Sequence, residues 1–188
     1  MTIQRKNFNR AYKLHAACAL REFRTELAYI CFRNDVAYCN NGHMAVRAKL
    51  KQISNFHPEE YKKLNGKCIH MDNFRRLLNY QVANITDNGF EVNDNGRRLL
   101  IYFGELEIID LNGDMDNIFE RCKADNLVGV HTTGIRESWL RIAASAMGSD
   151  MLKMEYYDGG NGRLFTNIYN PQSPIEIEAL IYEEVLKQ

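Results

Sequence analysis

Apolar and polar positions in the first third of the chain change from helical to strand spacing. From Phe8 to Leu20 the apolar residues recur every three to four positions, with Arg and Lys gathered on another side, which predicts an amphipathic helix. Three runs rich in β-forming residues follow, separated by the turn sequences Arg33-Asn34-Asp35 and Asn40-Asn41-Gly42. The chain is therefore expected to continue as three successive strands, at 27–32, 36–39 and 43–50.

This order of elements returns twice further along the chain. A polar connection, in which Pro58 is suited to begin a short helical turn, precedes the second unit. Asp72 is the expected N-cap of the second helix, and the run Gly159-Gly160-Asn161-Gly162 is the expected hairpin turn of the third unit. The two later units are expected to contain a strand, a helix and three strands each. In the second unit the strand is 68–70, the helix runs through 74–78, and the three strands are 82–86, 90–94 and 97–110. In the third unit the strand is 128–131, the helix is 136–147, and the three strands are 151–157, 164–169 and 175–181. The repetition predicts an α+β protein with mainly antiparallel sheets, in units of roughly 60 residues.

Composition narrows the class of protein. The chain has 188 residues, 45% hydrophobic and 26% charged, which suits one large ordered domain or two small ones. The first ten residues hold no apolar run, and no segment reaches the roughly 20 apolar residues that cross a bilayer. The five cysteines are odd in number and scattered, which is typical of reduced thiols. We therefore expect a cytoplasmic protein that does not contact the membrane.

The net charge of zero hides a strong asymmetry. Residues 1–100 contain 17 Lys and Arg against nine Asp and Glu, and residues 101–188 contain seven against 15, so the halves carry +8 and −8. A basic half attracts polyanions such as nucleic acid. The alternative is that the two halves attract each other, within one chain or head to tail between subunits.

Three stretches stand out: the turn Asn41-Gly42-His43-Met44-Ala45, GKCIHMDNFRRLL (66–78) and GIRESWLRIAASAMG (134–148). They resemble the bacterial DNA polymerase sliding clamp, the beta subunit of polymerase III. The turn stands where that family has its Asp-Gly-His signature, and the two longer stretches are similar to parts of the second halves of its middle and last domains. The resemblance covers most of residues 8–182 and implies a divergent, shortened clamp. It divides the chain into a clamp-like domain of two units (1–115) and a half-domain of one unit (116–188).

The resemblance implies a non-catalytic function. Helices of the family line a central hole and present Lys and Arg to phosphates without reading the sequence, so we expect duplex DNA binding and a processivity or tethering role in replication. A closed ring would require a homo-oligomer, and replication proteins are the expected partners. The family's Met-Pro segment near the C-terminus is absent here, so its peptide-docking cleft is not assigned. The alternative is a clamp-fold protein–protein interaction module without DNA binding.

The candidate DNA-binding residues are cations and their neighbours. Each predicted helix displays two cations on its polar face: Arg10 and Lys13, Arg75 and Arg76, Arg136 and Arg141. The loop that corresponds to a DNA-touching loop of the family, and the segment after the turn at Gly42, add Arg21, Phe23, Arg24, His43 and Arg47. Arginine binds phosphate in fork geometry, and an aromatic ring stacks on bases. The alternatives are ordinary solvated side chains on a helix surface and, for His43, a turn residue held by hydrogen bonds.

Other kinds of site are set aside. The run Asp110–Asp116 resembles the start of a calcium loop, but Met115 replaces the glycine of the sharp turn and Arg121 the bidentate glutamate. Histidines and cysteines lack the spacing of a zinc site, and no glycine-rich phosphate loop precedes a helix. We therefore expect no metal, no cofactor and no enzymatic activity.

Overall fold

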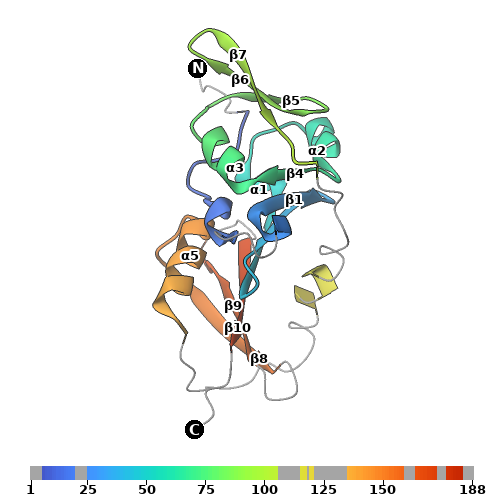
Figure 1. Ribbon diagram of the computed structural model, residues 1–188. Helices are drawn as coiled ribbons and strands as arrows, with labels where there is room; N and C mark the ends of the chain where they lie inside the picture. Colours follow the sequence, from blue (N-terminus) through green and yellow to red (C-terminus); the bar gives the residue numbers. More distant parts are fainter. Residues whose placement is uncertain are drawn as a thin grey trace.

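The computed structural model describes residues 6–19, 25–105, 115–117, 119–120, 135–158, 164–172 and 177–183. Its helical elements are short except for the last one (Figure 1). They are η1 Leu14–Ala17, η2 Thr25–Ala28, α1 Leu50–Ile53, α2 Pro58–Leu64, α3 Met71–Leu77 and α5 Glu137–Met147. The strands are β1 Tyr29–Arg33, β2 Val36–Asn40, β3 Met44–Lys49, β4 Cys68–His70, β5 Ala83–Ile85, β6 Gly89–Asp94, β7 Arg97–Tyr102, β8 Lys153–Asp158, β9 Leu164–Tyr169 and β10 Ile177–Glu183. The expected strand 128–131 and the turn 159–162 lie outside the described residues.

Two antiparallel sheets organise these strands. The larger has seven strands in the order β4-β1-β2-β3-β10-β9-β8, and the smaller has the order β5-β6-β7. The register of β3 and β10 runs from Met44 opposite Ile181 to Ala48 opposite Ile177. This pairing carries the large sheet from the first unit into the third, across the expected boundary between 1–115 and 116–188, which itself stays a prediction.

The hairpin between β1 and β2 follows from two residues. Asn34 and Asp35 adopt φ angles of 48° and 61°, the left-handed values that a two-residue type I′ turn needs. Asn and Asp tolerate this conformation better than other side chains with a Cβ. The turn predicted from the sequence is confirmed.

Alternation along the strands separates two clusters of buried side chains on opposite faces of the large sheet. The main core lies on the face of the large sheet that η1, α3 and α5 cover, and it includes buried side chains of the small sheet. It includes an aromatic group whose neighbouring ring centroids lie 5.0–6.5 Å apart: Phe8, Phe32, Phe56, Phe74 and Phe90. The second cluster, on the other face, contains Tyr38, Ala45, Met115, Phe119 and Leu180. We call this second face the outer face.

The helix expected from Phe8 to Leu20 is wrong. Only the four residues of η1 are helical, in a single 3-10 turn. Phe8 instead forms a bridge with Ser54, and the side chain of Asn9 accepts a hydrogen bond from the amide of Ala11. The amide of Lys13 donates to the carbonyl of Ser145 in α5. Tertiary partners therefore take the backbone groups that a helix would use, although the helical spacing did mark residues that are buried.

The N-cap of α3 also differs from the expected one. The imidazole Nδ1 of His70 accepts a hydrogen bond from the amide of Asp72 at 3.3 Å, so His70 is the cap and Asp72 lies in the first turn. The acidic side chain of Asp72 still lies near the positive end of the helix dipole. The remaining helix of this pattern, α5, begins one residue after its expected start and ends where expected, before Gly148.

Candidate nucleic-acid interface

The segment containing η1 packs between α3 and α5 (Figure 1). On the α5 side, the amide of Lys13 donates to the carbonyl of Ser145 at 3.0 Å. On the α3 side, the guanidinium Nε of Arg10 donates to the carbonyl of Leu78 at 2.7 Å. Residues from the first unit therefore join the helices of the second and third units. We call the surface formed by these three segments the helix face.

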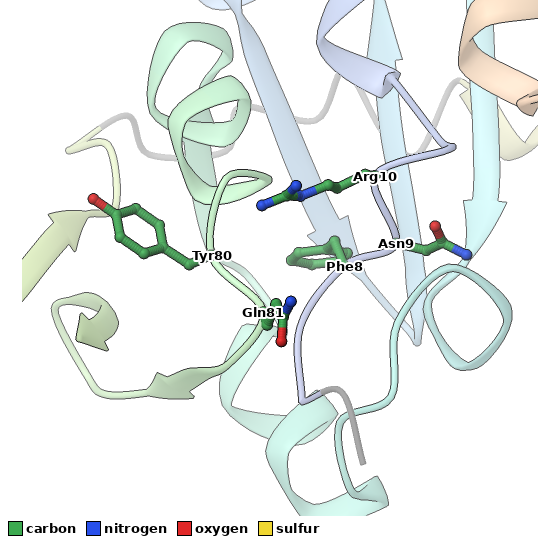
Figure 2. Close-up of a pocket in the computed structure, with 5 residues that line it drawn as sticks. All are labelled: Phe8, Asn9, Arg10, Tyr80 and Gln81. Atoms are coloured by element: carbon green, nitrogen blue, oxygen red, sulfur yellow. The ribbon is translucent and has the colours of Figure 1, made fainter. Parts of the chain in front are cut away.

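Arg10 stabilises the end of α3 as well as carrying charge. Besides the bond to Leu78, its Nη2 donates to the carbonyl of Asn79. The last carbonyls of a helix lack partners within the helix, and a cation there also meets the negative end of the dipole. Figure 2 shows the guanidinium beside a shallow pocket, which is lined by Phe8, Asn9, Arg10, Tyr80 and Gln81.

Lys13 and Arg75 both act electrostatically on His15. Burial lowers the pKa of the His15 imidazole, and the charges of Arg75 and Lys13 lower it further. The His15 ring lies 6.3 Å from the ring of Phe74, which anchors α3 in the core. The side chains of Lys13, Arg75 and Arg76 are exposed. The structure thus places cations from the η1 segment and from α3 on neighbouring parts of the helix face.

The two cations predicted on α5 have local partners. Arg141 pairs with Glu137 one turn earlier, with 2.7 Å between Nη2 and Oε1. The guanidinium carbon of Arg136 lies 5.4 Å from the centroid of the Trp139 ring. His43 stacks on the same tryptophan, with 5.5 Å between centroids and 20° between planes. His43 therefore belongs with the first turn of α5, and Trp139 joins the candidate site although sequence analysis did not single it out.

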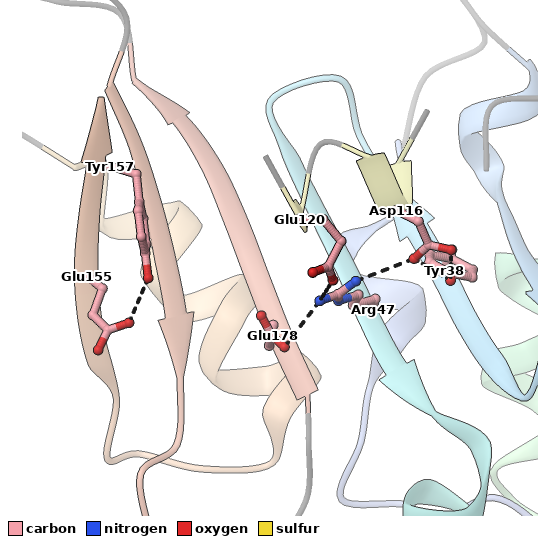
Figure 3. Close-up of polar contacts among 7 residues, drawn as sticks. All are labelled: Tyr38, Arg47, Asp116, Glu120, Glu155, Tyr157 and Glu178. Atoms are coloured by element: carbon pink, nitrogen blue, oxygen red, sulfur yellow. Dashed lines mark hydrogen bonds and ion pairs between the residues drawn. The ribbon is translucent and has the colours of Figure 1, made fainter. Parts of the chain in front are cut away.

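Arg47 lies apart from these residues, on the outer face of the sheet. Its side chain is 16% exposed and forms ion pairs with Asp116 at 3.4 Å, Glu120 at 2.9 Å and Glu178 at 3.6 Å (Figure 3). Its guanidinium carbon lies 4.5 Å from the centroid of the Phe119 ring. Three carboxylates therefore surround the charge that the sequence offered for phosphate binding, and they are too distant along the chain for sequence spacing to reveal them.

Tyr38 extends this network. Its hydroxyl donates to Asp116 at 2.7 Å, and burial followed by this hydrogen bond raises the pKa of the phenol. The segment around residues 115–120, whose described residues are helical, is thus fixed to the sheet by a hydrogen bond, by ion pairs to Arg47 and by the buried side chains of Met115 and Phe119.

A second polar group lies on β8 and β9 of the outer face. The carboxylate of Glu155 accepts hydrogen bonds from Tyr169 at 2.6 Å and Tyr157 at 3.0 Å, and Lys153 lies 3.0 Å away. The bond from Tyr169 is the main reason that the pKa of Glu155 is lowered. Burial, followed by the bond to Glu155, raises the pKa of Tyr157 to about 12. Sequence analysis missed this group, because alternation marks the face of a strand and not the partner across it.

Three predicted residues, Arg21, Phe23 and Arg24, lie outside the described residues, so their role stays a prediction. Within the described part of the chain, no three His, Cys, Asp or Glu residues gather as metal ligands would. No helix in that part is long and apolar enough to cross a membrane.

The comparisons with known proteins bear on the fold. No family model and no curated protein matches the chain. Among solved structures, the beta clamp of H. pylori, in complex with diflunisal, is similar with a TM-score of 0.54 and 10% sequence identity. The match covers 99% of this chain and 68% of that one. The chain therefore has a clamp-like fold with antiparallel sheets, which confirms the fold class expected from its sequence, and at this identity the likeness extends to the fold alone.

Proposed function

We propose that this protein is a non-catalytic, clamp-like protein that binds duplex DNA through its helix face without reading the base sequence. The observation that carries the proposal is the packing of the η1 segment against α3, which brings Lys13 and Arg75, two exposed cations from different units, to the same face. A phosphate backbone offers a row of negative charges, so a binding surface needs cations from more than one element. The clamp-like fold supports the non-catalytic role, and processivity or tethering is the task it suits.

The cations of the helix face differ in how available they are. Lys13, Arg75 and Arg76 are exposed, and Arg136 rests on Trp139. The exposed pair of Arg141 with Glu137 contributes little stability, so a phosphate can replace the carboxylate at low cost. The proposal leaves out Arg47, because its three carboxylate partners already compensate its charge on the opposite face.

The proposal predicts how affinity depends on salt. If Lys13, Arg75, Arg76 and Arg136 each contact one phosphate, the logarithm of the affinity falls with the logarithm of the salt concentration at a slope of about −3.6. Affinity then drops about 150-fold between roughly 50 and 200 mM salt. Fluorescence anisotropy with two labelled duplexes of unrelated sequence measures this slope, and equal slopes for the two duplexes are expected.

Paired variants locate the contact. In Arg75→Gln/Arg76→Gln the slope should become shallower by about 1.8, because two phosphate contacts are lost. The control Lys62→Gln/Lys63→Gln removes the same charge from adjacent exposed positions of α2, another seven-residue helix, and should leave the slope unchanged. Equal losses in both variants would contradict a defined binding face.

Absence of duplex binding at low salt would remove the DNA-binding function and leave the fold as it is. The protein–protein interaction module would then be the better hypothesis. Sedimentation of the same samples, with and without DNA, tests whether several copies assemble, as a closed ring requires.

A further inference from the structure

Two cysteines that are far apart in the sequence face each other at the edge of the large sheet. β4 is the edge strand and pairs only with β1 among the described strands. In the register of this pair, Cys31 of β1 stands directly opposite Cys68 of β4. Both therefore point to the same face, which is the outer face, because their neighbours Ile30 and Ile69 belong to the main core.

Backbone hydrogen bonds show which kind of pair this is. Phe32, the next residue of β1, is hydrogen-bonded to the two residues before β4, since its amide donates to the carbonyl of Lys67 and its carbonyl accepts from the amide of Gly66, both at 2.9 Å. Antiparallel ladders alternate, so Cys31 and Cys68 form a non-hydrogen-bonded pair. The carbonyl of Cys68 agrees with this assignment, because it accepts from Gly104, on the side of β4 away from β1.

This geometry suits a disulfide bond. Cα atoms of a non-hydrogen-bonded pair lie about 4.5 Å apart and their side chains approach closely. Disulfides span Cα separations of roughly 4.4–6.8 Å, so the bond needs little movement of the backbone.

The two thiols differ in access. Cys68 is 1% exposed, with its Sγ 3.7 Å from the carbonyl oxygen of Gly104, whereas Cys31 is only partly buried. The other two described cysteines, Cys18 and Cys39, are 3% and 2% exposed and both lie in the main core. A reagent in solution therefore reaches Cys31 first.

We infer that Cys31 and Cys68 are a site of oxidative modification, at which a small disulfide such as oxidised glutathione closes a disulfide between β1 and β4. The Cys31 thiolate attacks the reagent, which forms a mixed disulfide and releases one glutathione thiolate. Cys68, as thiolate, then attacks the Sγ of Cys31 and releases the second. Two protein thiols lose two electrons, the glutathione disulfide gains them, and the two protons end on the released thiols.

The bond would fix the edge strand from which α3 continues. It closes a loop of about 37 residues, and a cross-link of this length stabilises a folded chain chiefly by restricting the unfolded one. We expect the melting temperature to rise by roughly 5–10 °C on oxidation and to return on reduction. This inference does not depend on DNA binding.

The test uses the full chain, treated with oxidised glutathione in its folded state. Remaining thiols are then blocked with a maleimide, and peptides are mapped without reduction. We expect one disulfide, between Cys31 and Cys68, with the other three of the five cysteines alkylated. A different linkage, five alkylated cysteines, or Cys31 left as a mixed disulfide would overturn the inference.

Two variants separate chemistry from folding. Cys68→Ser should stop at the mixed disulfide on Cys31 and lose the rise in melting temperature. The control Cys39→Ala also loses one buried thiol, but should still form the Cys31–Cys68 bond with the full rise. Melting of both variants under reducing conditions shows whether each is folded. If Cys68→Ser does not fold, Cys31→Ser replaces it, because its position is more exposed. Cys31→Ser should form no disulfide and should show no rise in melting temperature.

Discussion

Replacement of Arg47 tests the ion-pair network on the outer face. The substitution Arg47→Met keeps the length and the apolar stem of the side chain and removes the charge. Glu178, whose side chain is only 15% exposed, then loses the counter-charge that lies 3.6 Å away. Asp116 and Glu120 are 43% and 66% exposed, so water solvates them when the arginine is gone.

The expected cost follows from these exposures. Removing one partner of a fully buried ion pair costs about 3–5 kcal/mol, and the value for Glu178 lies at or below the lower limit because both side chains keep some exposure. The pairs with Asp116 and Glu120 contribute roughly 0.2–1 kcal/mol each, and the contact of Arg47 with the Phe119 ring about as much. We expect a loss of about 3 kcal/mol. With a urea m-value of about 2 kcal/mol/M, the unfolding midpoint should fall by about 1.5 M.

A double-mutant cycle with Glu178→Gln identifies the source of the loss. Glu178→Gln removes the carboxylate charge that pairs with Arg47 in the wild type, so the double variant should be more stable than Arg47→Met alone, by about 1–2 kcal/mol. Lys51→Met, at an exposed position of α1, is the control and should change stability by less than about 0.5 kcal/mol. A midpoint for Arg47→Met within about 0.2 M of the wild type, or strictly additive effects of the two substitutions, would refute the reasoning.

Two further predictions concern Glu155 and Gly148. The lowered pKa of Glu155 means that its hydrogen bonds stabilise the fold at any pH above the ordinary glutamate pKa of about 4.3. This stabilisation is lost as the pH falls through the lowered pKa of Glu155 in the folded protein. Glu155→Gln should therefore narrow the difference between the urea midpoints at pH 7 and pH 3, and an unchanged difference would count against this role of Glu155. Gly148 ends α5 at φ 61°, and a Cβ there would lie 2.8 Å from the carbonyl oxygen of Ala11, so Gly148→Ala should lower stability by about 1–3 kcal/mol. Thermal unfolding measures this loss, and a neutral result would show that the contact between α5 and the η1 segment yields easily.

The sequence predicted correctly the turns and helix ends that depend only on the residues within them. The hairpin at Asn34 and Asp35 needs only two residues that accept positive φ, and α5 ends at a glycine in the left-handed conformation. The segment from Phe8 to Leu20 has helical spacing as well, but the amide of Asn9 donates to the carbonyl of Ile53, and the amide of Lys13 donates to that of Ser145. Spacing reports which side chains are buried, and it does not report where the amides find their acceptors.

The candidate site was predictable only in part, for a related reason. The exposed cations of α3 and α5 could be named from the sequence, because the polar face of a helix depends on local spacing. Their grouping could not, since it depends on contacts of the η1 segment with both α3 and α5. The ion-pair partners of Arg47 could not be predicted from the sequence, because they are far from it along the chain. Glu178 is on β10, and Asp116 and Glu120 are in the 115–120 segment.

The pairing of β3 with β10 explains why these groups meet at all. Because β10 continues the sheet directly beside β3, the third unit is held in line with the first, and α5 covers the same face of the sheet as η1. Along the same pairing Arg47 faces Glu178, so the register that aligns the two units also fixes the partly buried ion pair on the outer face. The register of β3 with β10 thus aligns the units that carry the cations of the helix face, and it places Arg47 beside Glu178 on the outer face. A shift of a single residue in this pairing would move every β10 side chain to the other face of the sheet. It would break the pair of Arg47 with Glu178, and it would also remove the buried β10 side chains from the main core.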